Sequence, residues 1–276
     1  MKKRSTTINT KRKHLLWLLL IPILFAAAGI DYIVFQRVSK ISDQNSTSTT
    51  VIDEPLTPKK NNSPINATTI STDNPIKHDV TIPPIQNGFA PVISNLNTKE
   101  PVVFLGIDDG ANKQSFELQL MKNNNIKASL FLANRFISDN PSFFKDFMSE
   151  GSQIEDHTMD HKLLPALTYN QQKQEICDEA DLFTKEYGRR PILFRPPGGS
   201  YNQDTQKAAA DCGMKAVVIW VAKANGGSMQ YQVGHSLRPG DIVLMHFRPE
   251  FQKDMQAFIS AEKAAGLHTE LLEDWL

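Results

Sequence analysis

From residue 101 onward, the chain alternates short apolar runs with longer amphipathic stretches. The apolar runs, rich in β-branched residues, predict buried strands at residues 102–107, 128–132, 154–156, 192–194, 216–220, 242–246 and 269–271. The amphipathic stretches predict helices at residues 113–123, 141–150, 169–187, 203–212 and 250–265. Alternating strands and helices form parallel sheets, so about seven such units predict an α/β fold, a distorted (β/α) barrel that is closed or nearly closed.

The N-terminal pattern is of a different kind. Residues 1–14, "MKKRSTTINTKRKH", carry six Lys or Arg and no acid, and the apolar run "LLWLLLIPILFAAAGIDYIVF" follows at residues 15–35. A run of this length is typical of a transmembrane helix, and the basic block predicts a cytoplasmic tail. We therefore expect a single-pass signal anchor in the cell membrane with the rest of the chain outside. Ala26-Ala27-Ala28 leaves a second reading open, a cleaved signal and a secreted protein.

Residues 36–98 are rich in Ser, Thr, Asn and Pro and show no helical or strand period. Such a segment buries too little apolar surface to offset its ordering entropy, which predicts a disordered stalk before a domain at residues 99–276. Over the whole chain, 30 Lys and Arg balance 30 Asp and Glu. Nothing in this charge balance indicates a nucleic-acid-binding protein.

Polar residues follow several of the predicted strands at their carboxyl ends. They are Asp108 and Asp109 in "VVFLGIDDGANK", His157 and His161 in "EDHTMDH", Arg195 in "FRPPGGSYN", and His246 in "LMHF". In β/α barrels the chemistry gathers at that end of the strands. Two adjacent carboxylates at one strand end repel each other, so their cost must be offset by water, a cation or a hydrogen-bond donor.

The two histidines suggest which of these it is. His157 and His161 are four residues apart, a spacing that puts both imidazoles on one face of a helical turn. The spacing alone is more often found in solvated neighbours than in metal ligands. Two histidines and one aspartate together, however, hold a divalent cation and leave a position open for water.

Four segments, "IDDG", "HTMDH", "RPPGG" and "LMH", resemble in this order four of the five motifs of the polysaccharide deacetylase family, the NodB-homology or carbohydrate esterase family 4 proteins. The resemblance extends over residues 101–276. It implies a metal-dependent hydrolase that removes N-acetyl groups from a cell-wall or surface polysaccharide and releases acetate. The metal in this family is most often zinc, and cobalt is an alternative.

The resemblance also implies a role for each site residue. Asp109, His157 and His161 would hold the metal, and Asp108 would be the general base that takes a proton from water. Arg195 would pair with Asp108 and keep it ionised and oriented.

Two further roles concern the later steps of the reaction. A backbone N–H of the "RPPGG" turn, at Gly198, would stabilise the oxyanion. His246 would protonate the leaving amine, a task suited to a group that titrates near neutral pH.

Two motifs depart from the family pattern in ways that leave the metal ligands intact. The usual first motif reads Thr-Phe-Asp-Asp-Gly-Pro, whereas Gly106 and Ile107 precede the aspartates here and Ala111 replaces the proline. We expect these changes to affect packing and loop shape. Gly198 stands where an aromatic residue is frequent, which predicts a roomier pocket.

The fourth motif is missing. The family usually carries an Asp and then an Asp-Trp pair after the fifth strand, whereas "VIWVAKANGGSMQ" has no acid and places Lys223 about where the first Asp would be. A lysine beside His246 would lower the pKa of that imidazole. Two alternatives therefore stay open: a weakly active or non-catalytic glycan-binding relative, and a metal hydrolase for another amide or ester.

Cys177 and Cys212 are the two cysteines of the chain, and both fall on predicted helices that neighbour each other on the barrel. An even number of cysteines outside the membrane permits a disulfide. Two buried free thiols are an equal alternative, since cysteine is often a small core residue.

Overall fold

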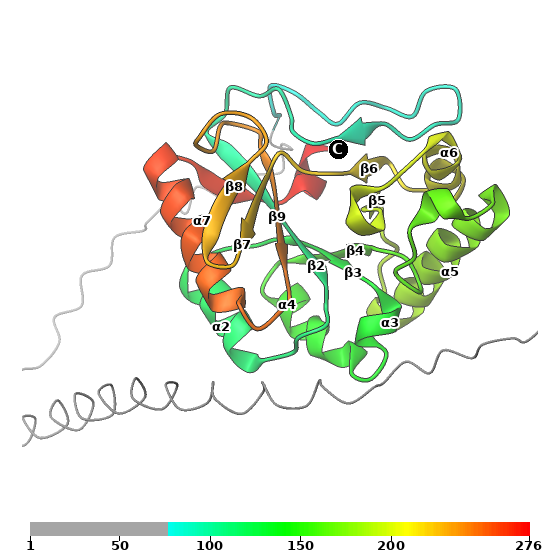
Figure 1. Cartoon of the computed structure of the whole chain (residues 1–276), viewed down its shortest axis with the longest axis horizontal. Coiled ribbons are helices and arrows are strands. Elements are labelled where there is room, and N and C mark those ends of the chain that lie inside the picture. Colours follow the sequence, from blue (N-terminus) through cyan, green and yellow to red (C-terminus); the bar gives the residue numbers. More distant parts are fainter. Residues whose placement is uncertain (1–76) are drawn as a thin grey trace, which may run out of the picture. The chain divides into compact units, whose positions relative to one another are not determined.

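The computed structural model describes residues 77–276, which fold into one twisted sheet with helices on its outer side (Figure 1). Its strands are β1 (Val92–Ile93), β2 (Val102–Asp109), β3 (Ser129–Leu132), β4 (Gln153–Asp156), β5 (Leu193–Phe194), β6 (Ala216–Val218), β7 (Ala222–Asn225), β8 (Ser228–Tyr231), β9 (Ile242–His246) and β10 (His268–Glu270).

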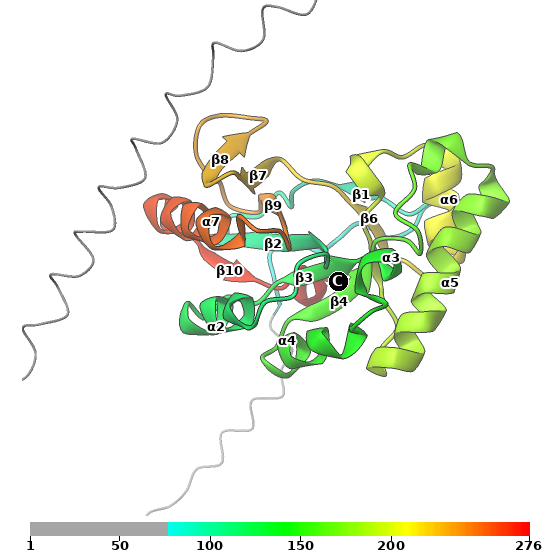
Figure 2. The same cartoon turned by 60° about the horizontal axis from the view of Figure 1, so that its bottom comes forward.

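The helices of this part of the chain connect most of the strands. The α-helices are α2 (Ser115–Asn123), α3 (Asn134–Ile137), α4 (Lys145–Ser149), α5 (Tyr169–Tyr187), α6 (Gln203–Asp211) and α7 (Phe251–Ala265). Four short 3-10 helices join them: η1 (Pro141–Phe144), η2 (Leu164–Ala166), η3 (Pro197–Gly199) and η4 (Leu272–Trp275). Figure 2 shows α2 beside α7 at one side of the sheet and α5 beside α6 at the other.

The strand order is β1-β6-β5-β4-β3-β2-β9-β7-β8, with β10 paired to the first half of β2. All strand pairs are parallel except β7 with β8, which form an antiparallel hairpin. The path has two ends, β1 and β8, that do not pair, so the sheet is a half-barrel. The expectation of a barrel of about seven parallel strands is therefore corrected: the α/β class holds, but ten strands of mixed direction form an open sheet.

Strand β2 lies at the centre of the sheet and explains where the site begins. Its residues alternate between the two faces: Val103, Leu105 and Ile107 pack outward against the helices, while Phe104 packs inside the half-barrel. Both faces are buried, as is usual for a central parallel strand. Asp108 continues the inward-facing series at the carboxyl end of the strand and is 2% exposed.

The predicted elements agree with the structure where the apolar pattern is long. Residues 169–187 and 242–246 match α5 and β9 to the residue. The predicted helix 141–150 is instead η1 followed by α4, and the strand predicted at 216–220 ends at Val218. After Val218 the chain turns away from β6 and toward β9. The N–H of Val221 donates to the carbonyl of Ile242 on β9, just before β7 begins.

Residues 77–98, predicted to be part of the stalk, belong to the folded unit. That unit therefore begins before the predicted boundary at residue 99. Ile82, Ala90 and Leu96 are buried, and the ring of His78 stacks on Trp275 with the centroids 3.8 Å apart. The N–H of Leu96 donates to the carbonyl of Gly240, just before β9. These isolated apolar residues, with no strand or helix period, find partners far along the chain, which local pattern cannot reveal.

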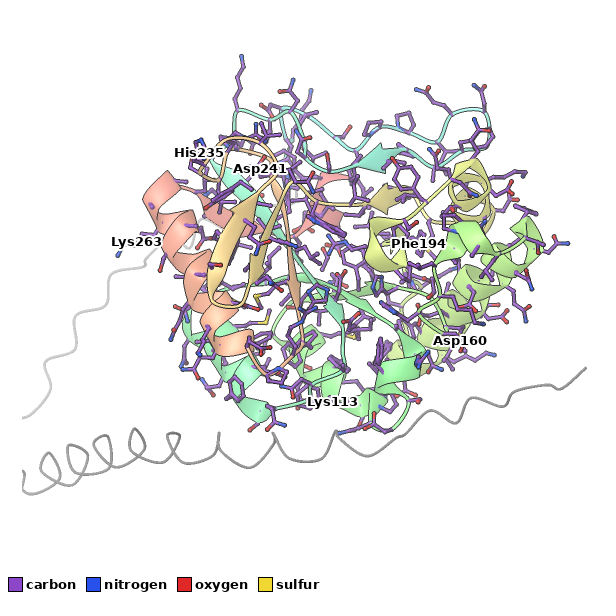
Figure 3. The ribbon with its side chains drawn as sticks, in the orientation of Figure 1. Lys113, Asp160, Phe194, His235, Asp241 and Lys263 are labelled. Atoms are coloured by element: carbon purple, nitrogen blue, oxygen red, sulfur yellow. A yellow bond between two sulfur atoms is a disulfide. The ribbon has the colours of Figure 1, made fainter. Side chains whose placement is uncertain are left out.

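This leader, residues 77–98, lies at the end of the sheet opposite to the strand ends that carry the polar motifs. Figure 3 labels Asp241, which precedes β9, near the leader, and Lys113, which follows β2, at the far end of the sheet. The tail at 1–14, the anchor at 15–35 and the stalk up to residue 76 lie outside the described residues. Within residues 77–276, no helix is long and apolar enough to span a membrane.

Cys177 of α5 and Cys212, which follows α6, form a disulfide with their Cα atoms 5.0 Å apart. The bond closes a loop with a sequence separation of 35. Loop-closure entropy for a loop of that size gives a stabilisation of about 4 kcal/mol. The structure thus resolves the alternative left open by the sequence in favour of the disulfide.

Candidate metal centre and active site

Three side chains converge at the carboxyl end of the central strands. The Oδ1 atom of Asp109 lies 3.2 Å from Nε2 of His161 and 3.6 Å from Nε2 of His157. One ligand atom from each of the three residues lies within 4.8 Å of the other two. Asp109, His157 and His161, which the sequence predicts as a ligand set, therefore lie close enough together to hold one metal ion.

Local backbone conformation is what turns these side chains toward one another. Asp109 has φ +75°, Thr158 has φ +76° and His161 has φ +54°, all in the left-handed region that non-glycine residues rarely adopt. The two histidines therefore meet through a tight loop at residues 157–161, which we call the metal loop, and not through one helical turn. Residues in such conformations persist only where surrounding contacts hold them, and they cluster at functional sites.

The protonation of His157 is set by its neighbour. Its Nδ1 lies 2.6 Å from the carbonyl oxygen of Arg195. A carbonyl can only accept, so Nδ1 carries the hydrogen and Nε2 presents its lone pair toward Asp109. His157 is 1% exposed, so this orientation is fixed within the protein interior.

Asp109 has the electrostatic character of a ligand. Burial opposes its ionisation, but the neighbouring imidazoles of His157 and His161 outweigh burial and lower the pKa of Asp109 well below its ordinary value. Within residues 77–276, its buried Oδ1 atom has no hydrogen-bond partner. A buried, ionised oxygen without a hydrogen-bond donor between two imidazole nitrogens fits a bound cation.

Asp108 lies beside this centre and is held by Arg195. Nη1 of Arg195 donates to Oδ1 of Asp108 at 2.6 Å, and the other carboxylate oxygen of Asp108 lies 3.7 Å from Nε2 of His157. The Arg195 side chain is fully buried, and its Cζ atom lies 4.1 Å from the ring centroid of Phe131. The ion pair predicted from the motifs is therefore a buried, oriented contact.

The guanidinium of Arg195 occupies space that Gly106 leaves free. A Cβ atom at position 106 would lie 2.3 Å from Nη1 and 2.4 Å from Nη2 of Arg195. The change at Gly106, expected to affect packing and loop shape, thus bears directly on the group that holds Asp108.

A pair of buried acids lies behind the metal loop. Asp156 is fully buried, and burial raises the pKa of Asp156 to about 7. Burial and the charge of Asp156 likewise raise the pKa of Glu179, whose oxygens accept from the backbone N–H groups of His157 and Asn134 at 2.8 and 2.7 Å. The charge of Asp156 thus disfavours the ionised form of Glu179, in addition to the effect of burial.

The "RPPGG" segment forms η3 on the same rim. Gly199 donates to the carbonyl of Pro196 and Ser200 to that of Pro197, whereas the N–H of Gly198 has no hydrogen-bond acceptor in the described part of the chain. A Cβ atom at position 198 would lie 3.4 Å from the side chain of Leu163, which is 59% exposed. The exposed side chain of Leu163 therefore lies next to position 198, where the family frequently has an aromatic residue.

His246 ends β9 in register with Asp108 on β2. Among residues 77–276, no carboxylate forms a hydrogen bond or ion pair with its ring, which agrees with the missing fourth motif. Burial and the Arg248 guanidinium lower the pKa of His246, against the opposing charges of Asp108 and Asp109. Arg248 thus lowers the pKa of His246, which is the effect that the sequence predicted for Lys223. Lys223 pairs with Leu244, two residues before His246.

Comparison with known proteins identifies the family. A family model described as polysaccharide deacetylase matches residues 95–217. A peptidoglycan-N-acetylglucosamine deacetylase of Bacillus cereus is 30% identical over 156 residues, which cover 53% of this chain and 73% of that protein. The chain belongs to the polysaccharide deacetylase family, carbohydrate esterase family 4.

Other relatives extend the comparison. A Streptomyces coelicolor protein without an assigned function is 37% identical over 155 residues, covering 55% of this chain and 62% of that protein, so the chain spans less than two thirds of it. The structure of Bacillus subtilis PdaA, a family 4 carbohydrate esterase, superposes with a TM-score of 0.56 at 21% identity and covers 72% of this chain and 94% of that one.

A third solved structure has a different description. A family 4 pseudoenzyme from Bacillus anthracis superposes with a TM-score of 0.57 at 19% identity, covering 67% of this chain and 68% of that one. At these identities the solved structures establish the fold alone.

Sequence reasoning missed several residues that shape the site. Gly106 carried a signal, because glycine inside a strand often marks the close approach of another group. Glu175 and Glu179 carried one too, because they place acids on the apolar face of α5, beside Ile176 and Ala180. Arg248 had no local signal, since its effect depends on the fold around His246.

Proposed function

We propose that this polysaccharide deacetylase removes N-acetyl groups from a cell-wall or surface glycan in a metal-dependent reaction. The observation that carries the proposal is the convergence of Asp109, His157 and His161 beside an Asp108 that Arg195 orients. The set supplies both a cation site and a general base within one buried centre. The coarser assignment, deacetylase chemistry, follows from the family.

Asp109, His157 and His161 would hold the metal, for which we propose zinc, with cobalt as a substitute. Two imidazole nitrogens and one carboxylate oxygen suit either ion and leave coordination positions open. When bound, such a cation polarises a carbonyl oxygen and lowers the pKa of water. The remaining chemistry falls to side chains and backbone of the chain.

Asp108 takes the proton from the attacking water in this proposal. Its Oδ1 is engaged by Arg195, so the other oxygen remains to accept that proton. The N–H of Gly198 donates to the oxyanion that develops from the acetyl carbonyl, a role that its lack of an intramolecular acceptor supports. His246 then donates a proton to the nitrogen of the leaving amino sugar.

For the substrate, we propose peptidoglycan. Relatives named as peptidoglycan deacetylases support this choice, among them the Bacillus cereus protein and a Bacillus subtilis peptidoglycan-N-acetylmuramic acid deacetylase that is 27% identical over 161 residues. A bifunctional xylanase/xylan deacetylase of Cellvibrio japonicus, 28% identical over 152 residues, represents the other polysaccharide class to be tested.

We also propose that residues 15–35 anchor the protein in the cell membrane with the domain outside, as the apolar run and the basic tail indicate. Fractionation of cells that express the tagged full chain tests this. Recovery of the intact chain in the membrane fraction would agree with the anchor, whereas a shortened chain in the medium would indicate cleavage near Ala26-Ala27-Ala28.

A second candidate function is a weakly active or non-catalytic glycan-binding protein. The observation that favours it is the His246 ring, which has no carboxylate partner among residues 77–276 and a lowered pKa. Such an imidazole is mostly neutral at pH 7 and is then a poor proton donor. The fold of the Bacillus anthracis pseudoenzyme agrees with this candidate without requiring it.

The deciding experiment measures acetate release by the purified full-length chain. The protein is stripped of metal, given Zn²⁺ or Co²⁺, and incubated with peptidoglycan, N-acetylglucosamine oligomers and acetylated xylan. Asp108→Asn is the test variant, and Asp178→Asn, which alters an exposed aspartate of α5, is the matched control. Metal-dependent acetate that disappears in Asp108→Asn alone is the expected result.

The other outcomes separate the alternatives. Tight metal binding with no acetate from any substrate would refute the deacetylase proposal and favour glycan binding. Release of a different acid from another amide or ester would indicate another metal hydrolase.

A further inference from the structure

The metal loop does not hold its own conformation. Thr158 and His161 are both left-handed, and each such residue is strained relative to the ordinary regions of backbone space. Within the loop, the N–H of Thr158 donates to Asp156, and the N–H of His161 donates to the hydroxyl of Thr158. The N–H groups of His157, Met159 and Asp160 are left for partners from elsewhere, and that of His157 also donates to the carbonyl of Leu132 at 3.1 Å.

Helix α5 supplies those partners through two acids one turn apart. Glu179 accepts from the N–H of His157 at 2.8 Å with one oxygen, and from the N–H of Asn134 at 2.7 Å with the other. Glu175 accepts from the N–H of Asp160 at 2.9 Å, and its backbone carbonyl accepts from Met159 at 3.1 Å. The two side chains therefore reach the loop at its beginning and near its end.

The placement of these acids is costly without such a role. Glu179 is fully buried and Glu175 is 6% exposed, on the helix face that also buries Ile176 and Phe183. A carboxylate in that position is tolerated only when hydrogen bonds replace its hydration. All four carboxylate oxygens of the two acids accept hydrogen bonds, because the second oxygen of Glu175 accepts from Nζ of Lys162 at 2.7 Å.

We propose that Glu179 and Glu175 are positioning residues that set metal affinity through the backbone of the metal loop, without touching the metal. The inference rests on the metal site proposed above. Asp109 comes from a different strand end and forms no hydrogen bond with Glu175 or Glu179, so the two acids act on the histidine side of the site. Partners of this outer kind commonly change metal affinity by about 10–100-fold when they are removed.

Glu179→Gln is the decisive variant in the full-length protein. Glutamine keeps the side-chain length but offers one acceptor oxygen, so its amide NH₂ must face a backbone N–H of either His157 or Asn134. Glu175→Gln makes the same change at the outer end of the loop. Asp178→Asn, on the exposed side of the same helix, is the control.

The measurement is the Zn²⁺ dissociation constant from competition with a chromophoric chelator, supported by the absorption spectrum of the Co²⁺-loaded protein. We expect affinity to fall about 10–100-fold in Glu179→Gln, less in Glu175→Gln, and not at all in Asp178→Asn. Saturating Zn²⁺ is expected to restore most of the activity of Glu175→Gln. General destabilisation would not give that rescue.

Equal affinities in all four proteins would overturn the inference and leave the proposed function standing. Failure of the unaltered protein to bind metal would overturn both. If Glu179→Gln does not fold, Glu175→Gln decides alone. The ion pair that Glu175→Gln removes is made with Lys162, which is about half-exposed, so the loss of this pair leaves the core intact.

Discussion

Replacement of Gly106 by alanine tests whether this glycine exists to admit Arg195. Glycine inside a strand is normally inferior to alanine by about 0.5–1 kcal/mol, and Gly106 does not have a positive φ that would penalise a side chain. Judged by backbone alone, Gly106→Ala should therefore stabilise the protein. The structure predicts the opposite sign.

The magnitude follows from the contacts of the added methyl group. It would lie 2.3, 2.4 and 2.7 Å from three atoms of the guanidinium, roughly 1 Å inside ordinary contact distance. The guanidinium cannot simply shift, because Asp108, the carbonyl of Val218 and the ring of Phe131 hold it. Overpacking of this kind costs about 1–3 kcal/mol, and loss of the buried ion pair costs about 3–5 kcal/mol.

We therefore expect Gly106→Ala to lower the free energy of unfolding by about 3 kcal/mol. Each kcal/mol shifts Tm by about 2–4 °C in a domain of this size, so the predicted decrease is about 6–12 °C. Thermal unfolding followed by circular dichroism measures it. Acetate release should fall by at least about 100-fold as well, because Asp108 loses the donor that orients it.

Arg195→Lys provides the matched background. Lysine is thinner at its head group, so the methyl group of Gly106→Ala should cost much less there, and the two substitutions should couple in a double-mutant cycle. A Gly106→Ala protein with the Tm and activity of the unaltered chain would refute the reasoning. So would a cost that is the same in both backgrounds.

Two further predictions concern pH. His246 must be protonated to act as an acid, and Arg248 helps to lower the pKa of His246. Arg248→Gln should therefore move the alkaline limb of the pH profile of kcat to higher pH, while Arg248→Lys should leave it in place. An unmoved limb in Arg248→Gln would contradict the role of His246 as the acid. At the other end of the sheet, burial raises the pKa of Glu155 and of Glu273, so the folded state binds their protons more tightly and stability falls as pH rises above the ordinary range near 4.5. Glu273→Gln removes one of these charges, and its Tm gain over the unaltered protein should be larger at pH 8 than at pH 5, whereas a gain that is the same at both would be evidence against the buried pair.

The fold could be predicted from sequence where the hydrophobic period is long. Helix α5 and strand β9 were predicted at their observed bounds, because nineteen helical residues and a five-residue strand with four consecutive buried residues leave a clear pattern. Strand β1 has two residues and is held by its pairing with β6, so no local pattern predicts it. The open sheet likewise follows from pairings that single segments do not encode.

The β7–β8 hairpin is a different kind of omission. Its strands carry Lys, Asn, Ser and Gln, which weakens the strand signal, but Asn225-Gly226-Gly227 is a recognisable hairpin turn and both glycines have positive φ. The hairpin was therefore predictable from its turn, although its strands carry no clear apolar period.

The site was predictable as a set of residue types in a fixed order and less so as a geometry. The motif order placed Asp109, His157 and His161 together, and the structure brings their ligand atoms within reach of one ion. The left-handed backbone of the metal loop and the acids of α5 that hold it were not predictable. Both depend on contacts between a loop and a helix that begin as separate segments of chain.

The disulfide joins this network at a sensitive position. Cys177 lies on α5 between Glu175 and Glu179, so its bond to Cys212 fixes the helix from which both acids reach the metal loop. Samples of identical sequence made in a reducing cytosol and in an oxidising compartment will therefore differ in the freedom of that helix. A count of free thiols belongs beside every metal titration of this protein, because a reductant in the buffer would loosen this helix in addition to any binding of the ion by its own thiols.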